Sequence, residues 1–387
     1  MQKEIMTENF IDIKSLKCVF NKNQFNEIVA IDDLTASFDE NQIHFLIGNS
    51  GSGKTTLILH FNGLIRLKKG HIKIDDFHIY QNKKIKKPKV LRKKISMVFQ
   101  FPEYQLFKDS VISDVSFGPK VLGIPKEKSF ANNLELINKE IKENLNKILK
   151  DFFPNDNILE NEKLNKNDKI SLEKKIDDFL KNYSVKFNNK KILKNNKYKI
   201  EYNNMTVDYT STQKFISPSE IQFNMSKKYL NALGIDDSYF KRSPFGLSGG
   251  QKRRVAISGI LSIEPKILVF DEPTAGLDPA GEQEMMQIIK TAKKNKQTIF
   301  VVSHNMDHVL ELADNIVVMD KGKIIARGNP YEIFLNKKLC EDVKLDKPKI
   351  IDFVLDLINA DKKYQYLLDT KPRTISELAL AINKGKK

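Results

Sequence analysis

The sequence predicts an α/β fold in which helices cover a parallel β-sheet, and two observations support that prediction. First, the apolar run "IHFLIG" at 43–48 leads into a glycine loop and then into "TTLILHFNGLI" at 55–65, whose apolar residues suit a helix packed on a sheet. Second, three further apolar runs alternate with helical stretches: strands at 266–270, 298–303 and 315–320, and helices around 281–294 and 306–313. Such alternation is typical of parallel strands joined by helices.

The N-terminal part predicts further strands. The segments "IDIKSLKCVF" at 11–20 and "AIDDLTASF" at 30–38 are strand-like runs separated by polar turns. We therefore expect a β-rich start to the domain, ahead of the glycine loop.

Composition limits the class of protein without choosing a ligand. The chain has 387 residues, 40% of them hydrophobic, which is enough for a full core and a smaller second module. Its 65 Lys and Arg outnumber 49 Asp and Glu, so the net charge is +16. That charge suits nucleic acid, an anionic membrane surface or a phosphorylated ligand, but an AT-rich coding sequence would also enrich Lys.

Cysteine usage and apolar patterning indicate the compartment. Cys18 and Cys340 lie far apart, so the sequence has neither a disulfide framework nor a CxxC-type metal site, which fits a reducing cytoplasm. The first residues contain no apolar leader segment, and no window approaches the roughly 18 apolar residues that a membrane-spanning helix needs. If the protein works at a membrane, we expect it to do so from one side.

Residues 126–226 interrupt the alternation and are interpreted as an insert. They contain 18 Asn, and no Gly occurs between Gly123 and Gly234. Apolar residues at a spacing of three to four predict a helix within 130–152, and "YSVKF", "KYKIEY" and "MTVDYT" predict β-ribbon strands. Long insertions in surface loops are tolerated, so the insert is either a surface elaboration without chemistry or a contributor to function.

The glycine loop predicts a phosphate-binding site. "GNSGSGKT" matches G-x-x-x-x-G-K-[ST] and lies between a buried strand and a helix. Glycines allow the loop to approach phosphates closely and to point backbone N–H groups at them, next to the positive end of the helix. Lys54 would reach the β- and γ-phosphates, the Thr55 hydroxyl would bind Mg²⁺, and Thr56 would lie near the α-phosphate. The residues expected to bind ATP here are Gly48, Asn49, Ser50, Gly51, Ser52, Gly53, Lys54, Thr55 and Thr56.

Two acids and a histidine supply the chemistry that a phosphate-binding loop lacks. Asp271 ends the apolar strand in "KILVFDEP", where it can hold magnesium, and Glu272 follows, where it can polarise an attacking water. His304 follows the strand "FVVS", which places it at the same carboxyl edge of the sheet. We therefore expect loop, acids and histidine to converge on one γ-phosphate.

The order of these motifs identifies a family resemblance. The glycine loop, Gln100, "LSGGQ" at 247–251, "LVFDEPTAGLD" and His304 together resemble the nucleotide-binding domain of ATP-binding cassette (ABC) ATPases. The resemblance implies that "LSGGQ" caps the nucleotide held by a partner subunit, and so it implies a dimer. A serine hydroxyl, glycine N–H groups and the positive end of the following helix suit a phosphate. The residues assigned to the partner's ATP are Ser248, Gly249, Gly250, Gln251 and Asp278, the last of which communicates between the two sites.

Further roles follow from the same resemblance. Gln100, in "MVFQFPEYQLF", is assigned to Mg²⁺ and the lytic water, and it starts the segment that couples to the membrane partner. The catalytic set is therefore Glu272, His304 and Gln100, and the magnesium set is Thr55, Gln100 and Asp271. The adenine-stacking aromatic of the family is usually Tyr. The residue at that spacing here is Phe20, which can stack but cannot form a hydrogen bond.

Within this family, the sequence is more similar to the ATPase subunits of energy-coupling factor (ECF) transporters, which drive vitamin and metal-ion uptake in prokaryotes. The agreeing stretches are "LILHFNGLI", "FQFPEYQLF", "SFGPK", "SPFGLSGGQKRRVAISGIL" and "DEPTAGLDP". The pattern is nearer the second of the two ATPase paralogues. This resemblance implies ATP and Mg²⁺ as cofactors and a peripheral position on the cytoplasmic face of the cell membrane. The implied partners are the other ATPase paralogue, a membrane coupling (T) subunit and substrate-binding (S) membrane subunits, with no nucleic acid.

The expected fold class is thus an ABC-type P-loop NTPase. It combines a RecA-like core, an N-terminal antiparallel β subdomain, a helical signature subdomain that carries the insert, and short C-terminal helices. The expected division is 1–125 for the first part of the ABC domain, 126–226 for the insert, 227–335 for the second part and 336–387 for the C-terminal helical extension.

Two other classes of ATPase share some of these features. DNA-repair and chromosome ATPases also carry insertions between the glycine loop and "LSGGQ", and a net charge of +16 suits DNA. However, the insert lacks the sustained heptads of a long coiled coil, and no cysteine pairs form the zinc sites of excision-repair relatives. A translation-factor ABC protein would contain two cassettes, and this sequence contains one.

Overall fold

The computed structural model describes residues 10–122, 171, 174–175, 197–202, 205–210 and 218–384. Contacts divide the chain into two compact units: the first combines Met1–Gly118 with Tyr229–Lys387, and the second is Pro119–Lys228. The glycine loop, the acids, His304 and "LSGGQ" all belong to the first unit.

The second unit contains two of the predicted ribbon strands. β7 (Lys197–Tyr202) and β8 (Met205–Thr210) pair antiparallel, from Lys197 opposite Thr210 to Tyr202 opposite Met205. The helix predicted within 130–152 and the strand predicted at 183–187 lie outside the described residues.

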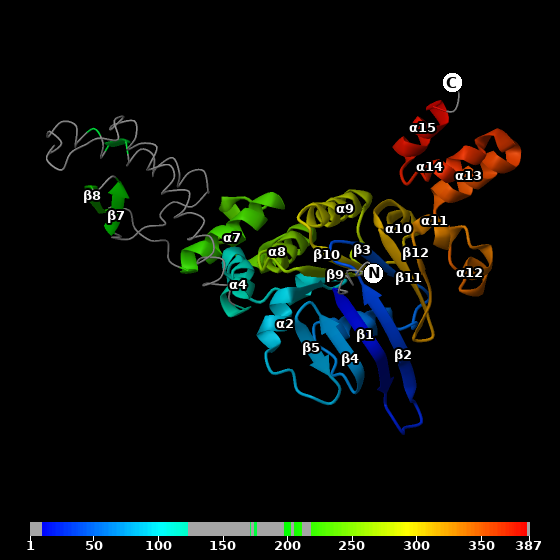
Figure 1. Ribbon diagram of the computed structural model, residues 1–387, viewed down its shortest axis with the longest axis horizontal. Coiled ribbons are helices and arrows are strands. Elements are labelled where there is room, and N and C mark those ends of the chain that lie inside the picture. Colours follow the sequence, from blue (N-terminus) through cyan, green and yellow to red (C-terminus); the bar gives the residue numbers. More distant parts are fainter. Residues whose placement is uncertain are drawn as a thin grey trace. The chain divides into compact units, whose positions relative to one another are not determined.

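Two β-sheets form the framework of the first unit (Figure 1). The four-stranded sheet is antiparallel, in the order β2 (Ile28–Phe38), β1 (Ile11–Phe20), β4 (Lys69–Ile74) and β5 (Phe77–Tyr80). The six-stranded sheet has the order β12 (Lys323–Gly328), β11 (Asn315–Asp320), β3 (Ile43–Ile47), β10 (Thr298–Val302), β9 (Ile267–Asp271) and β6 (Ile95–Val98). Its strands are parallel except for β12, which pairs antiparallel with β11.

Helices and 3-10 turns connect these strands or, from α11 on, follow the last of them. Up to the "LSGGQ" segment they are α1 (Lys54–Phe61), α2 (Pro88–Lys94), η1 (Pro102–Gln105), α3 (Val111–Val115), α4 (Phe117–Leu122), α7 (Pro218–Ala232), η2 (Asp237–Tyr239) and η3 (Pro244–Gly246). The remaining ones are α8 (Gly249–Leu261), α9 (Pro279–Lys294), α10 (Met306–Leu312), α11 (Pro330–Phe334), α12 (Lys337–Asp342), α13 (Lys349–Ala360), η4 (Lys362–Tyr366), α14 (Leu367–Thr370) and α15 (Ile375–Lys384).

Both faces of the six-stranded sheet are buried, because successive side chains of a strand point to opposite faces. Along β10, Ile299 and Val301 pack into one core cluster, whereas Phe300 and Val302 pack into the other. Helices α9 and α10 complete the first cluster. Helix α1 and the four-stranded sheet complete the second, so α1 packs between the two sheets.

The predicted strands and helices of the first unit are confirmed, with one difference at the end of α1. The sequence pattern predicts helix to residue 65, but α1 ends at Phe61. Gly63 follows with φ of 70°, a left-handed conformation that ends helices and that glycine adopts without steric cost. The glycine at this position therefore overrides the apolar periodicity.

Phe61 lies at the centre of the core between the two sheets. It is fully buried, and its ring meets those of Phe300 and Phe38 edge to face, with centroids 5.1 and 6.4 Å away. We expect Phe61→Ala to lower the free energy of unfolding by about 3–5 kcal/mol, through lost burial and the cavity left behind. Urea denaturation followed by circular dichroism measures this loss.

The matched control is Phe25→Ala, because Phe25 is fully exposed in the β1–β2 turn. We expect a change within about 0.5 kcal/mol there. Equal losses in the two variants would contradict this description of the core.

Candidate active site

The parallel strand register brings the predicted site residues to one edge of the six-stranded sheet. Val302 of β10 lies opposite Leu46 of β3 on one side and opposite Asp271 of β9 on the other. The residues just beyond these positions are the glycine loop after β3, Glu272 after β9 and His304 after β10. This carboxyl edge is where open α/β sheets bind their ligands.

The glycine loop is tight against neighbouring backbone at two of its glycines. Gly48 has φ of 134°, and a Cβ there would lie 2.0 Å from the carbonyl oxygen of Met319 at the end of β11. Gly53 has φ of 101°, and its Cβ would lie 2.4 Å from the carbonyl oxygen of Ala30 in β2. Glycine is therefore required at both positions by conformation and by space.

Lys54 lies across this loop. Its Nζ donates hydrogen bonds to the carbonyl oxygens of Gly48 and Asn49, each at 2.8 Å, and to Ser52 Oγ at 3.3 Å. The side chain is buried, which lowers the pKa of the ammonium, while the carboxylates of Glu272 and Asp271 act in the opposite direction. The charge of Lys54 thus lies beside both the loop and the acid pair.

Thr55 and Asp271 meet at the start of α1. The Thr55 hydroxyl donates a hydrogen bond of 3.2 Å to Asp271 Oδ1. Burial raises the pKa of Asp271, against the opposing effects of this hydrogen bond and of Lys54. The pair presents a hydroxyl and a carboxylate oxygen side by side, and oxygen atoms are the ligands that Mg²⁺ prefers.

Glu272 and His304 form the second contact of the site. His304 Nε2 lies 3.0 Å from Glu272 Oε1, with 55% of the histidine side chain and 25% of the glutamate side chain exposed. Burial raises the pKa of Glu272, His304 lowers it, and Asp271 raises it. A partly desolvated carboxylate of raised pKa is suited to accept a proton from water.

The backbone of Glu272 is held in a sparsely populated conformation. Its φ is 50°, and its N–H donates a hydrogen bond of 3.0 Å to the carbonyl oxygen of Val302. A non-glycine residue in the left-handed region costs about 1–3 kcal/mol and persists only where neighbouring contacts determine it. The β9–β10 contact therefore fixes the direction of this side chain.

Gln100 and Phe20 lie at the ends of other strands. Gln100 is exposed, two residues beyond the last residue of β6. Phe20 is the last residue of β1, pairs with Ile28 and is 40% exposed, so its side chain is partly accessible. Among the residues that the structure describes, the Thr55–Asp271 hydrogen bond joins the glycine loop to the acid pair, and the Glu272–His304 contact joins the acid pair to the histidine. No hydrogen bond or ion pair of these residues joins Gln100 or Phe20 to them.

The "LSGGQ" segment forms the N-terminus of α8. Ser248 and Gln251 make a capping box: Ser248 Oγ accepts from the Gln251 N–H at 3.3 Å, and Gln251 Oε1 accepts from the Ser248 N–H at 3.1 Å. Asp278 is the N-cap of α9, with Oδ1 accepting from the Gly281 N–H at 2.8 Å. In the described part of the chain, no hydrogen bond or ion pair links Ser248 or Gln251 to the glycine loop.

Sequence reasoning missed two residues that support the site. Arg253 of α8 is 7% exposed, and its guanidinium donates to the carbonyl oxygen of Pro273, the residue after Glu272. Gly322, between β11 and β12, donates its N–H to the Ser52 carbonyl oxygen at 3.0 Å. The signals that point to them are the basic run "KRR" that precedes the apolar part of α8 and a glycine in a "KGK" turn, but neither signal specifies its partner.

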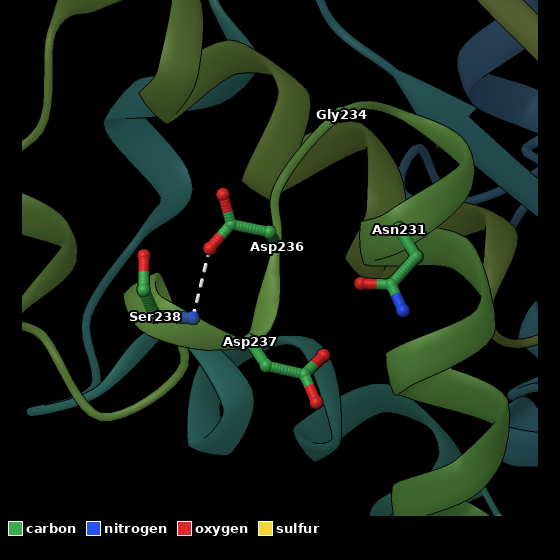
Figure 2. A pocket seen from close by; sticks show the side chains of 5 residues that line it. All are labelled: Asn231, Gly234, Asp236, Asp237 and Ser238. Carbon is green, nitrogen blue, oxygen red and sulfur yellow. Dashed lines mark hydrogen bonds between the residues drawn. The ribbon is translucent and has the colours of Figure 1, made fainter.

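A surface hollow of about 420 Å³ lies apart from these groups, between the end of α7 and η2. Figure 2 shows its lining, in which the carboxylate of Asp236 is turned to the backbone of Ser238. That bond is 2.8 Å long and caps η2. The Asp236 carboxylate therefore stabilises the start of η2.

Comparisons with known proteins agree with this geometry. A family model described as ABC transporter matches residues 31–275, more than half of the chain. The energy-coupling factor transporter ATP-binding protein EcfA2 of Ureaplasma parvum serovar 3 is 38% identical, over 100% of this chain and 96% of its own. The protein of the same name from Mycoplasma genitalium is 37% identical, over 98% and 95%. The chain belongs to the family of ECF transporter ATP-binding proteins.

Solved structures agree at the level of the fold. CbiO1 from Clostridium perfringens, described as part of the ABC transporter complex CbiONQ, has a TM-score of 0.52 at 26% identity, covering 88% of this chain and 97% of its own. An ATP-binding cassette of an ABC transporter in its ADP conformation has a TM-score of 0.53 at 20% identity, covering 87% and 98%. The predicted family, its second paralogue, the fold class and the activity as an ATPase of an ECF-type transporter are confirmed. No helix among the described residues combines the length and apolarity needed to cross a membrane.

The glycine loop generates a prediction about stability. Gly51 has φ of 78°, but nothing lies within 4 Å of a Cβ built there, in contrast to Gly48. We expect Gly51→Ala to cost about 1–2 kcal/mol, from the backbone conformation alone. Gly48→Ala should cost about 1–3 kcal/mol more, because its methyl group meets the Met319 carbonyl. Urea denaturation of both variants measures the difference, and equal costs would contradict the packing described here.

Proposed function

We propose that the chain is the ATP-hydrolysing motor subunit of an ECF-type importer and powers the uptake of vitamins or metal ions. The observation on which this rests most directly is the 3.0 Å contact between Glu272 and His304, beside Lys54, Thr55 and Asp271 at one sheet edge. A general base, a phosphate loop and an oxygen ligand pair are the parts that ATP hydrolysis needs.

ATP binding is assigned to the loop and to one aromatic ring. The backbone N–H groups from Gly48 to Thr56 and the Lys54 ammonium would hold the phosphates, and the exposed face of Phe20 would stack on adenine. Thr55, Asp271 and Gln100 would hold Mg²⁺, a set that fits its preference for oxygen ligands. When bound, the ion neutralises charge on the phosphates.

Hydrolysis is assigned to Glu272 with His304. The carboxylate would orient water for attack on the γ-phosphate and accept its proton, and burial raises its pKa toward the value that a base needs. His304 would orient the Glu272 carboxylate and would contact the γ-phosphate. The strained backbone of Glu272 keeps the acid aimed at this edge.

The position of "LSGGQ" supports a dimer. Ser248, Gly249, Gly250 and Gln251 begin α8, so N–H groups and the positive helix end are available for a phosphate of a partner subunit. Asp278, at the start of α9, would communicate between the two nucleotides. We propose the other ECF ATPase paralogue as this partner.

Docking to the membrane coupling subunit is assigned to the segment after Gln100. Phe101, Tyr104 and Phe107 are 43%, 84% and 51% exposed, and the rings of Phe101 and Tyr104 lie 5.8 Å apart. Clustered exposed aromatic rings are typical of protein interfaces. Binding there would place the chain on the cytoplasmic face of the membrane, beneath the coupling subunit and the substrate-binding subunits.

Replacing the proposed base tests the hydrolytic assignment. We expect Glu272→Gln to lower ATP turnover by about 10²–10⁴-fold, because the proton acceptor is lost. The phosphate loop is unchanged, so ATP should stay bound and hold the dimer together. Turnover of the purified complex and its retention of ATP on gel filtration measure both effects. Normal turnover by Glu272→Gln would refute the role of this residue.

Replacing the exposed aromatic residues tests the docking surface. We expect the double variant Phe101→Ser with Tyr104→Ser to lose co-purification with the membrane coupling subunit from solubilised membranes, while ATP binding stays. Mass spectrometry identifies the partners. Phe25→Ser, which changes an exposed ring elsewhere, should retain them. Recovery of the wild-type chain with DNA or ribosomes instead would contradict the transporter assignment.

A further inference from the structure

Helix α10 connects directly to the proposed switch residue. It starts at Met306, two residues after His304, and Asn305 caps it by accepting the His308 N–H at 3.2 Å. It has only 7 residues, so it depends on its surroundings to keep its place, because isolated helices this short are unstable. Whatever holds α10 therefore also sets the position of His304.

The C-terminal extension binds the first turn of α10. Asp307 Oδ1 accepts the backbone N–H of Lys349, the first residue of α13, at 2.8 Å. The residue in the cap position of α13 is Pro348, which makes no side-chain cap. Asp307 thus supplies from α10 the acceptor that the start of α13 lacks, and this joins the two helices.

The same extension also binds the end of α10. The Arg373 guanidinium donates a hydrogen bond of 2.8 Å to the carbonyl oxygen of Ala313, the residue that ends the helix. A cation at this position satisfies a free carbonyl and favours the negative end of the helix. The neighbouring Pro372 is held by the buried Tyr331 hydroxyl, which donates to its carbonyl oxygen at 2.7 Å.

Between the Asp307 and Arg373 hydrogen bonds, apolar side chains pack α10 against the C-terminal extension. Val309 and Leu310 of α10 are fully buried in the same cluster as Phe334 of α11, Val343 at the end of α12 and Ile351 of α13. On the α9 side, His308 Nε2 lies 3.8 Å from Glu282 Oε2. Helix α10 is therefore held at both ends, and along one side, by residues that follow β12.

We infer that the C-terminal extension positions His304 against Glu272 through α10, with Asp307 and Arg373 as the positioning residues. Hydrogen bonds weaken steeply beyond about 3.5 Å, and the His304–Glu272 contact is 3.0 Å, so a shift of α10 by less than 1 Å weakens it. The phosphate loop connects β3 to α1 and takes no part in the His304–Glu272 contact. The extension thus acts on the hydrolytic step and leaves ATP binding unchanged. This inference rests on the role proposed for His304.

Steady-state ATPase kinetics of the purified complex test it. We expect Arg373→Ala and Asp307→Ala each to lower kcat by about 10-fold or more, because misplacement of about 1 Å in a catalytic group costs up to about 100-fold. The KM for ATP should stay within about 2-fold, since the loop is unchanged. Asp307→Asn keeps the acceptor oxygen and should restore most of kcat. Lys337→Ala, at a side chain of α12 that is 82% exposed, is the matched control and should match wild type.

A His304→Ala background distinguishes positioning from general destabilisation. If Arg373 acts through His304, adding Arg373→Ala to His304→Ala lowers kcat no further. An unchanged kcat in both single variants, an equal loss with and without His304, or a loss of ATP binding in Arg373→Ala would overturn the inference. Wild-type activity of His304→Ala itself would instead refute the proposed role of His304. Those two failures are therefore distinguishable.

Discussion

Parallel pairing of β3, β10 and β9 is the constraint on which the rest of the site depends. Because Val302 lies opposite both Leu46 and Asp271, the three strands end level with one another, and the residues that follow them share one edge. Each strand is short and fully buried at its centre, so a shift of one residue would exchange the two core faces. The core thus keeps the acid pair in register with the glycine loop.

Around this edge, strain and close packing are found where chemistry is proposed. Glu272 is in the left-handed region, and Gly48 admits no side chain because of the Met319 carbonyl. Both features depend on backbone from another strand, β10 for the acid and β11 for the glycine. Helix α8 also depends on backbone from another segment, because Arg253 near its start donates a hydrogen bond to the carbonyl oxygen of Pro273, the residue after Glu272. Arg253 therefore links the signature helix to the segment that carries the acid pair.

The sequence predicts most of this arrangement, and the parts that it misses have a common cause. Strands, the glycine loop and the acids are local patterns, in which the residue types and their spacing are enough to predict the structure. Asp271 at the end of an apolar run is an example. Arg253, Asp307 and Arg373 act on backbone carbonyl or N–H groups distant in sequence, and any residue can supply such a group. The sequence around these three side chains does not indicate which backbone group each will bind, so the partner is known only from the fold. The end of α1 differs from the prediction for a related reason, since the left-handed Gly63 outweighs the apolar spacing.

The most direct test of this account is a structure of the chain with Mg²⁺ and a non-hydrolysable ATP analogue. We expect γ-phosphate oxygens within hydrogen-bonding distance, about 3.2 Å, of Lys54 Nζ and of the His304 ring, with a water between the phosphate and Glu272. We also expect Thr55 and Asp271 on the metal side of the phosphates. A nucleotide bound with its phosphates away from this sheet edge, or with Glu272 turned from the γ-phosphate, would contradict the assignment.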